Sequence, residues 1–174
     1  MAVHMVAERP GLTRGVLFVH STPRALCPHL EWAVSDVLGT RVSLDWMPQP
    51  VVPGQVRAEI SWQSMPGTGA RLTSALRQFR TARYEVAEEP SKGSEGERFA
   101  VTPSLGVFRA TMGPHGDILI HEERIRAVLA TGGSDAALLR AGLDAVLGTA
   151  WDAELEPFRR AGDGVPVRWL HQVV

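Results

Sequence analysis

The strictest constraint on the fold is an alternation of apolar and polar side chains over residues 56–63. The apolar members are Val56, Ala58, Ile60 and Trp62, and the polar members are Arg57, Glu59, Ser61 and Gln63. Successive side chains of a β-strand point to opposite faces of a sheet, so this run predicts a strand with one buried face.

Strand and helix patterns alternate on both sides of this run. Further strands are expected at residues 16–20, 42–47 and 84–87, and a helix with one apolar face at residues 72–82. The first helix has two alternative starts, at Thr22-Pro23 or at Pro28, and Gly39 is its expected end.

Residues 14–90 therefore run strand, helix, strand, strand, helix, strand. This order is typical of the ferredoxin-like βαββαβ unit, in which two helices cover one face of a four-stranded antiparallel sheet. The fold class expected for the chain is accordingly α+β.

The second half of the chain predicts a β-meander followed by helices. Short strands are expected at 99–102, 107–112 and 118–121, and the sequence leaves open whether they extend the first sheet. Helices are expected over 122–131, after a cap at Ser134, and onward to Gly162, with strand character in 165–174. The expected organisation is a flexible leader at 1–13, the ferredoxin-like unit at 14–90, and an α+β extension at 91–174 packed on the same body.

Composition excludes several classes of protein. Apolar residues make up 44% and charged residues 21% of the 174, which is typical of a folded globular chain. A net charge of −1 argues against nucleic acid as a partner, and no apolar run is long enough to span a membrane. The single cysteine, Cys27, excludes an internal disulfide, and the absence of a secretory pattern at the start favours a bacterial cytoplasmic location.

Cys27 is the first candidate for chemistry, with His20 and His29 near it in sequence. A thiol at a helix start beside an imidazole is the arrangement of an activated nucleophile. The alternative is that Cys27 packs as a small apolar group. The histidines lack the spacing of a metal site, so we expect neither metal nor cofactor.

The second candidate is an anion or ligand site formed by Gly67, Thr68, Gly69 and Arg71 between a strand and a helix. Glycines allow backbone amides to approach an anion, and an arginine can close over a phosphate. The alternative is a simple turn, because neither a third glycine nor a Walker lysine follows.

The third candidate is a basic flank of the helix expected at 72–82. On a helical wheel Arg77 and Arg80 are neighbours beside the apolar face, and such a flank fits an acidic protein partner. A solvated helix surface is the alternative.

Five segments together resemble one family. They are GVLFVHS at 15–21, ALCPHLEW at 25–32, VSLDW at 42–46, LEPFR at 155–159 and VRWLH at 167–171. The chain is similar along nearly its whole length to the actinobacterial family known as "domain of unknown function 3145". The resemblance supplies no catalytic residues. It implies a link to fatty-acid synthesis or acyl-CoA carboxylation, with an acidic acyl carrier protein or a carboxylase subunit as partner.

The sequence favours a non-catalytic accessory or protein-binding subunit over an enzyme, because no complete set of catalytic groups can be assembled from it. Under this interpretation Arg77 and Arg80 bind the partner. The alternative is a protein that binds a phosphate- or acyl-bearing small molecule, or a thiol-dependent enzyme that uses Cys27. Both interpretations leave homo-oligomerisation open.

Overall fold

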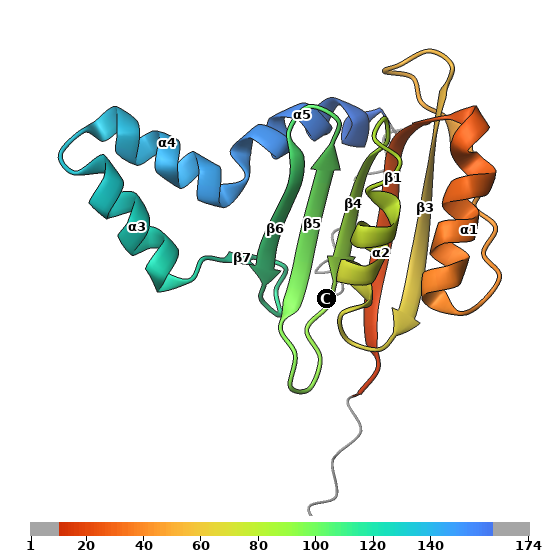
Figure 1. Ribbon diagram of the computed structural model, residues 1–174, viewed down its shortest axis with the longest axis horizontal. Helices are drawn as coiled ribbons and strands as arrows, with labels where there is room; N and C mark the ends of the chain where they lie inside the picture. The colour runs from red at the N-terminus through yellow and green to blue at the C-terminus, as the bar shows by residue number, and fades with distance from the viewer. Residues whose placement is uncertain (1–10, 162–174) are drawn as a thin grey trace, which may run out of the picture.

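The computed structural model describes residues 11–161, which form one antiparallel sheet of seven strands (Figure 1). The strands lie in the order β2-β3-β1-β4-β5-β6-β7. They are β1 Thr13–Pro23, β2 Met47–Pro48, β3 Gln55–Ser64, β4 Arg83–Glu88, β5 Gly96–Thr102, β6 Gly106–Met112 and β7 Ile118–Leu119. The meander of β5, β6 and β7 therefore extends the first sheet.

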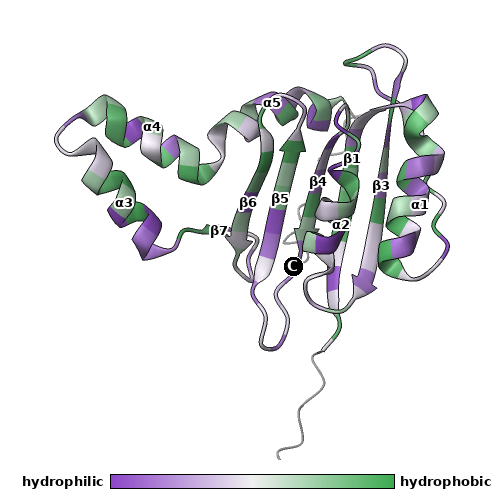
Figure 2. Cartoon of the chain, viewed as in Figure 1, coloured by the Kyte–Doolittle hydropathy of each residue, from purple (hydrophilic) through white to green (hydrophobic). Residues whose placement is uncertain are grey.

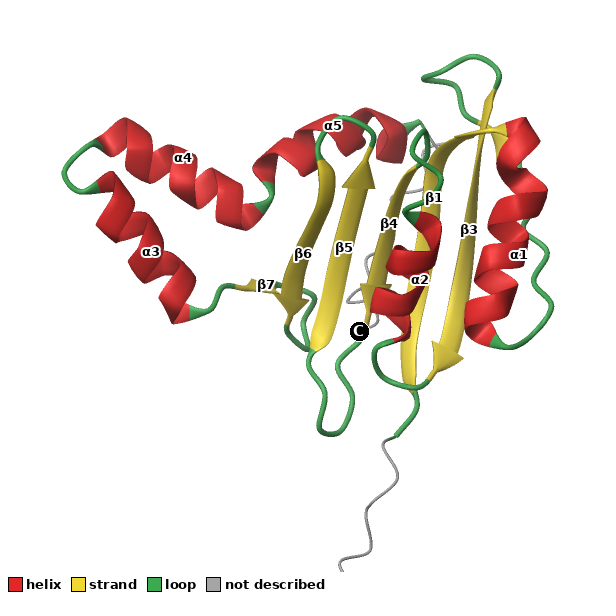
Figure 3. Cartoon of the chain, viewed as in Figure 1, coloured by secondary structure: helices red, strands yellow, loops and turns green. Residues whose placement is uncertain are grey.

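Five α-helices and one 3-10 turn complete this part of the chain (Figure 3). They are η1 Arg24–Leu26, α1 Cys27–Leu38, α2 Thr68–Leu76, α3 Glu122–Gly132, α4 Ala136–Leu147 and α5 Thr149–Arg160. The α+β class expected from the sequence is confirmed.

Helices α1 and α2 cover one face of the sheet, and the main core lies beneath them. The alternation over residues 56–63 holds in β3, where Ala58 and Trp62 join this core and Glu59, Ser61 and Gln63 are exposed. Its largest fully buried members include Tyr84, Leu17, Leu30, Leu72 and Leu76.

Helix α5 packs on the opposite face, and α3 and α4 form a hairpin that projects beyond β7 (Figure 1). Leu155 of α5 is fully buried in a second cluster with Ala100 and Phe108. The two faces of the sheet are thus covered by helices from different halves of the chain.

The expected strand at 42–47 is wrong, because only Met47 and Pro48 pair with β3. Val42 and Leu44 are still buried in the core, which explains their alternating pattern. Their amides donate to side chains of α1: Val42 N to Ser35 Oγ at 2.9 Å and Leu44 N to Glu31 Oε1 at 2.9 Å. Side-chain acceptors thus replace the sheet partners that a strand would require.

The bounds of the first helix agree with one of the two alternatives, whereas those of the helix expected over 72–82 differ from expectation. Helix α1 uses the start at Pro28, whereas Thr22 lies in β1, and it ends at Gly39 in the left-handed conformation as expected. The helix expected over 72–82 ends at Leu76, because the chain must turn there to enter β4; bonds from Phe79 N to Leu76 O and from Ala82 N to Phe79 O form those turns.

The cap expected at Ser134 belongs instead to Asp135. Its carboxylate accepts hydrogen bonds from the amides of Ala137 and Leu138, so α4 begins one residue later than a serine cap would place it. Most of the leader expected at 1–13 and the strand expected in 165–174 lie outside the described residues, although Thr13 already belongs to β1.

Candidate functional site

A groove of about 440 Å³ lies where the segment after α2 meets the β5–β6 hairpin. It is lined by Arg77, Phe79 and Arg80, by Tyr84 of β4, and by Thr102 and Val107 of the hairpin. Helix α2 packs on β4 and β5, and the groove opens to solvent beyond the end of this helix, beside the β5–β6 hairpin (Figure 1). We call it the arginine groove.

The two arginines of the groove are exposed, and neither has an ion-pair partner within residues 11–161. The structure brings them together as expected, but not on a helical flank. Arg77 caps α2 and Arg80 lies in the turn that follows. Their shared position thus comes from the turn geometry, which the helical wheel did not predict.

The remaining groups of the groove are poor candidates for acid–base or nucleophilic chemistry. The Tyr84 hydroxyl donates to Thr73 O at 3.0 Å, and burial raises the pKa of Tyr84 even though Arg77 acts to lower it. Thr102 Oγ1 accepts a hydrogen bond from Leu105 N at 3.1 Å. The groove therefore supplies positive charge and shape rather than reacting atoms.

The predicted anion site at Gly67–Arg71 already contains an anion that belongs to this chain. The carboxylate of Glu88, at the end of β4, accepts from Gly67 N at 2.7 Å and from Gly69 N at 2.6 Å. Arg71 donates to Thr68 Oγ1 at 2.7 Å. The glycines thus perform the chemistry expected of them, but with an internal carboxylate in place of a ligand.

The structure does not assemble Cys27 and the two histidines into a catalytic group. Within residues 11–161 no hydrogen bond joins the thiol to either imidazole; the His29 ring meets Trp32 edge-on, and His20 Nε2 lies 2.7 Å from Glu85 Oε2. Burial, followed by the nearby charge of Glu31, raises the pKa of the Cys27 thiol, although Arg24 acts to lower it. A thiol with a raised pKa is a weak nucleophile near neutral pH.

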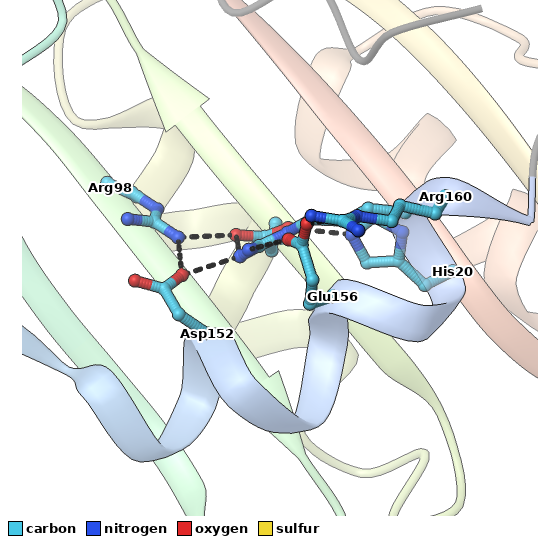
Figure 4. Close-up of polar contacts among 7 residues, drawn as sticks. His20, Arg98, Asp152, Glu156 and Arg160 are labelled. Carbon is cyan, nitrogen blue, oxygen red and sulfur yellow. Dashed lines mark hydrogen bonds and ion pairs between the residues drawn. The ribbon is translucent and has the colours of Figure 1, made fainter. Parts of the chain in front are cut away.

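His20 belongs instead to a group of polar and charged side chains, buried except for Asp152, that joins α5 to the sheet (Figure 4). We call this group, formed by His20, Glu85, Arg98, Asp152 and Arg159, the Glu85 cluster. The Arg159 guanidinium binds Glu85 through two bonds, from Nε at 2.8 Å and from Nη2 at 2.7 Å. Arg98 bridges the two acids, donating to Glu85 at 2.9 Å and to Asp152 at 2.5 Å.

The acids and arginines of the cluster stabilise each other's charged forms. Burial raises the pKa of Glu85, but hydrogen bonds and charge from His20 and Arg159 outweigh it and hold that pKa well below its usual range. Burial acts to lower the pKa of Arg159, yet Glu85 and Asp152 raise it overall. Glu85 therefore stays ionised near neutral pH, and its bonds to Arg98 and Arg159 hold α5 against β4 and β5.

Sequence reasoning missed this cluster because the acids of α5 resemble a solvated surface. Asp152, Glu154 and Glu156 alternate along the helix, which spreads them around its circumference. In the structure Asp152 faces Arg98, and Glu154 receives a bond from Arg83 at 3.2 Å. The available signal was Glu85 itself, an acid in the middle of a strand whose neighbours are apolar.

One family model matches residues 16–172, under the description "Protein of unknown function (DUF3145)". The chain belongs to the DUF3145 family. The matched region of this DUF3145 chain contains the whole arginine groove and the whole Glu85 cluster. Comparison with curated proteins and with solved structures gives no match. Among the described residues of the DUF3145 chain, none of the helices has the length and apolar character needed to cross a bilayer.

Proposed function

We propose that this protein is a non-catalytic accessory subunit that docks an acidic partner protein in the arginine groove. The observation that carries the proposal is the pair of exposed arginines, Arg77 and Arg80, which line one groove without an ion-pair partner in the described part of the chain. Two guanidinium groups at one site attract carboxylates and steer their approach.

The partner expected at such a groove carries carboxylates beside apolar side chains. Val107 lines the groove, Leu105 lies in the adjoining turn, and both are partly exposed. An interface of this kind combines an apolar contact with charge recognition at its rim. An acyl carrier protein or a carboxylase subunit in bacterial fatty-acid metabolism is the partner we propose, in the cytoplasm, where the lone thiol of Cys27 stays reduced.

The test compares three tagged versions of the chain as baits in the native host. The first is wild type, the second carries Arg77→Glu and Arg80→Glu, and the third carries Arg24→Glu and Arg41→Glu. The third is a matched control, because Arg24 and Arg41 are also exposed and the change in net charge is the same. Captured proteins are quantified by mass spectrometry.

The proposal predicts an acidic protein that is captured by the wild type and by the control but is lost with Arg77→Glu/Arg80→Glu. An identical set of captured proteins for all three baits contradicts the proposal. Equal loss with the control also contradicts it, because the effect would then follow net charge rather than the groove.

A phosphate-bearing small molecule in the same groove is the second candidate. The groove volume of about 440 Å³ favours it, since small-molecule sites range from roughly 300 to 1,000 Å³. Titration with pyrophosphate, followed by amide NMR shifts, tests this candidate directly. Saturable shifts at Arg77, Arg80 and Thr102 support it, and a lack of shifts at millimolar concentration rejects it.

A further inference from the structure

Strand β6 lies at the edge of the sheet along most of its length. On one side, all of its residues from Gly106 to Met112 pair with β5. On the other side only Thr111 and Met112 pair, with the short strand β7, which Figure 1 shows beside one end of β6. Within residues 11–161, residues 106–110 therefore have no strand on their outer side. A strand edge of this kind is a template on which a further strand can form.

The hydrogen bonds of the β6–β7 turn show which backbone groups of this edge are free. In an antiparallel strand the N–H and C=O of one residue point to one side, and those of the next residue point to the other side. Gly113 N donates to Asp117 O at 2.9 Å, so the groups of Gly113 point away from β5. Val107 and Arg109 precede it by an even number of residues, so their N–H and C=O point away from β5 as well. No hydrogen bond from elsewhere in residues 11–161 reaches these four groups.

Trp151 of α5 limits the free edge at the β5–β6 turn. Its indole Nε1 donates to Gly106 O at 3.0 Å, and its ring lies 5.4 Å from that of Phe108. Phe108 belongs to the apolar cluster beneath α5, so its side chain lies on the face of the sheet opposite α2. The free edge is thus short, and the residue between its two open positions faces an aromatic surface.

The same stretch of β6 forms one wall of the arginine groove. Val107 lines the groove beside Val101, its partner on β5, which belongs to the core beneath α1 and α2. Side chains two residues apart share a face, so Arg109 lies on this face too, where its guanidinium stands 5.7 Å from the ring centre of Phe99. Figure 2 shows green, apolar positions on β5 and β6 next to the turn that joins them. A strand added to β6 would therefore direct alternate side chains to the groove.

We infer that the acidic partner docks as an extended segment that adds a strand to the free edge of β6. This inference rests on the proposed function and specifies the form of the partner. Two residues of the segment lie opposite Val107 and Arg109 and exchange four backbone hydrogen bonds with them. Their side chains are acidic, because they lie on the face that carries Arg77 and Arg80. The residue between them is apolar, because it faces Phe108. Backbone bonds supply affinity in this binding mode, and alternate side chains supply specificity.

Charge favours an acidic segment over a second copy of this chain. Two β6 edges that pair antiparallel around a two-fold axis keep the same face of both sheets on one side. Such pairing would gather Arg77, Arg80 and Arg109 of both copies on one surface, where like charges repel. In the described part of the chain, Glu97 offsets one of these three charges through its ion pair with Arg109. A segment with two carboxylates removes this repulsion, and a second copy increases it.

Amide hydrogen exchange of the full chain, measured by NMR with a synthetic peptide, tests the inference. The probe is acetyl-Thr-Glu-Val-Glu-Thr-amide, which has the acidic, apolar, acidic pattern. We expect the amides of Val107 and Arg109 to exchange about tenfold more slowly at about 90% occupancy, because only the unbound tenth exchanges freely. The Phe108 and Ala110 amides point to β5 and should keep their rates.

Two methylated forms of the peptide are matched controls. Methylation of both glutamate amides removes the donors that face β6, so it should abolish binding. Methylation of the valine amide removes a donor that points away from β6, so binding should remain. Charge and side chains are the same in both forms, and only the position of the lost donors differs.

A pair of variants tests the same bonds on the side of the protein. Arg109→Pro and Arg109→Thr both remove the guanidinium and its ion pair with Glu97, but only proline also removes the N–H. An edge position whose N–H points away from the sheet tolerates proline. Arg109→Pro should bind the peptide about three- to tenfold more weakly than Arg109→Thr. Circular dichroism establishes that both variants fold, and if Arg109→Pro does not, the methylated peptides on the wild type decide the question.

Three results would overturn strand addition at β6. The first is no binding of the peptide up to about 10 mM, or binding that leaves exchange at Val107 and Arg109 unchanged. The second is equal binding of the two methylated peptides. The third is slower exchange of the same amides as protein concentration rises without peptide, because a second copy then occupies the edge. The proposed function fails separately, when Arg77→Glu/Arg80→Glu captures the same proteins as the wild type.

Discussion

Glu85 is the residue on which the junction between α5 and the sheet depends most. It is fully buried and is bound by His20, Arg98 and Arg159. Glu85→Gln removes the negative charge and leaves two buried guanidinium groups with less compensation. We expect the free energy of unfolding at pH 7 to fall by about 3–5 kcal/mol. Urea denaturation measures this fall, and Glu123→Gln on exposed α3 is the control, expected to change stability by less than about 0.5 kcal/mol.

The same residue predicts how stability depends on pH. The pKa of Glu85 in the folded protein lies below the value of about 4.3 in the unfolded chain, so the folded state binds fewer protons in acid. Its stabilisation is complete above about pH 5 and is lost as the pH falls towards its folded pKa. The wild type should therefore lose stability between about pH 5 and 3 more steeply than Glu85→Gln. Parallel pH profiles of the two proteins would contradict the ion-pair account.

Glu88 gives a second prediction at the scale of single residues. Its two carboxylate oxygens accept from Gly67 N and Gly69 N, and Glu88→Gln replaces one acceptor by a donor that faces an amide. The buried mismatch should lower the free energy of unfolding by about 1–3 kcal/mol. In the wild type, phosphate should leave the Gly67 and Gly69 amide resonances unchanged. A saturable phosphate shift there would restore the glycine segment as a ligand site.

The segment that connects α1 to β2 is held in place by side chains of α1 rather than by a neighbouring strand. Glu31 Oε1 accepts from Leu44 N and from Trp46 Nε1, both at 2.9 Å, and so replaces a strand partner. Glu31→Ala should therefore increase the hydrogen-exchange rate of the Leu44 amide at least tenfold. The Val42 amide, held by Ser35, is an internal reference that should keep its protection. Asp36→Ala, an exposed substitution on the same helix, should change neither rate, and equal acceleration in both variants would contradict this role of Glu31.

At the scale of elements, hydrophobic periodicity correctly predicted whether most segments are helices or strands. It failed where backbone amides donate their hydrogen bonds to side chains instead of to a neighbouring strand. The β3 alternation was sufficient because one face of that strand is buried and the other is wet. Residues 42–47 have the same alternation, but a pattern of burial does not reveal which group accepts each amide. The helix at 72–82 was predicted too long because Phe79 and Ala82 still pack inward after the backbone has turned.

The candidate site was predictable only in part, for a related reason. The helical wheel identified Arg77 and Arg80 as neighbours, although the groove between them and the β5–β6 hairpin depends on contacts distant in sequence. The Glu85 cluster joins residues as far apart as His20 and Arg159, and no local pattern encodes such a contact. Likewise, the sequence correctly indicated that the amides of the glycine segment bind an anion. It did not indicate that this anion is the carboxylate of Glu88, which lies at the end of β4.

For the whole molecule, the arginine groove depends on segments that are distant in sequence. Its residues come from the end of α2 and the turn after it, from β4, and from the β5–β6 hairpin. The docking surface therefore exists only when the sheet and α2 are assembled.

The most direct test of the docking proposal is a binding isotherm between the purified acidic partner and three versions of this chain. Wild type and Arg24→Glu/Arg41→Glu should bind with equal affinity that weakens as salt rises from about 50 to 300 mM. Arg77→Glu/Arg80→Glu should bind at least about 100-fold more weakly at low salt. Equal affinity for all three versions, or an affinity independent of salt, would contradict docking through the arginine groove.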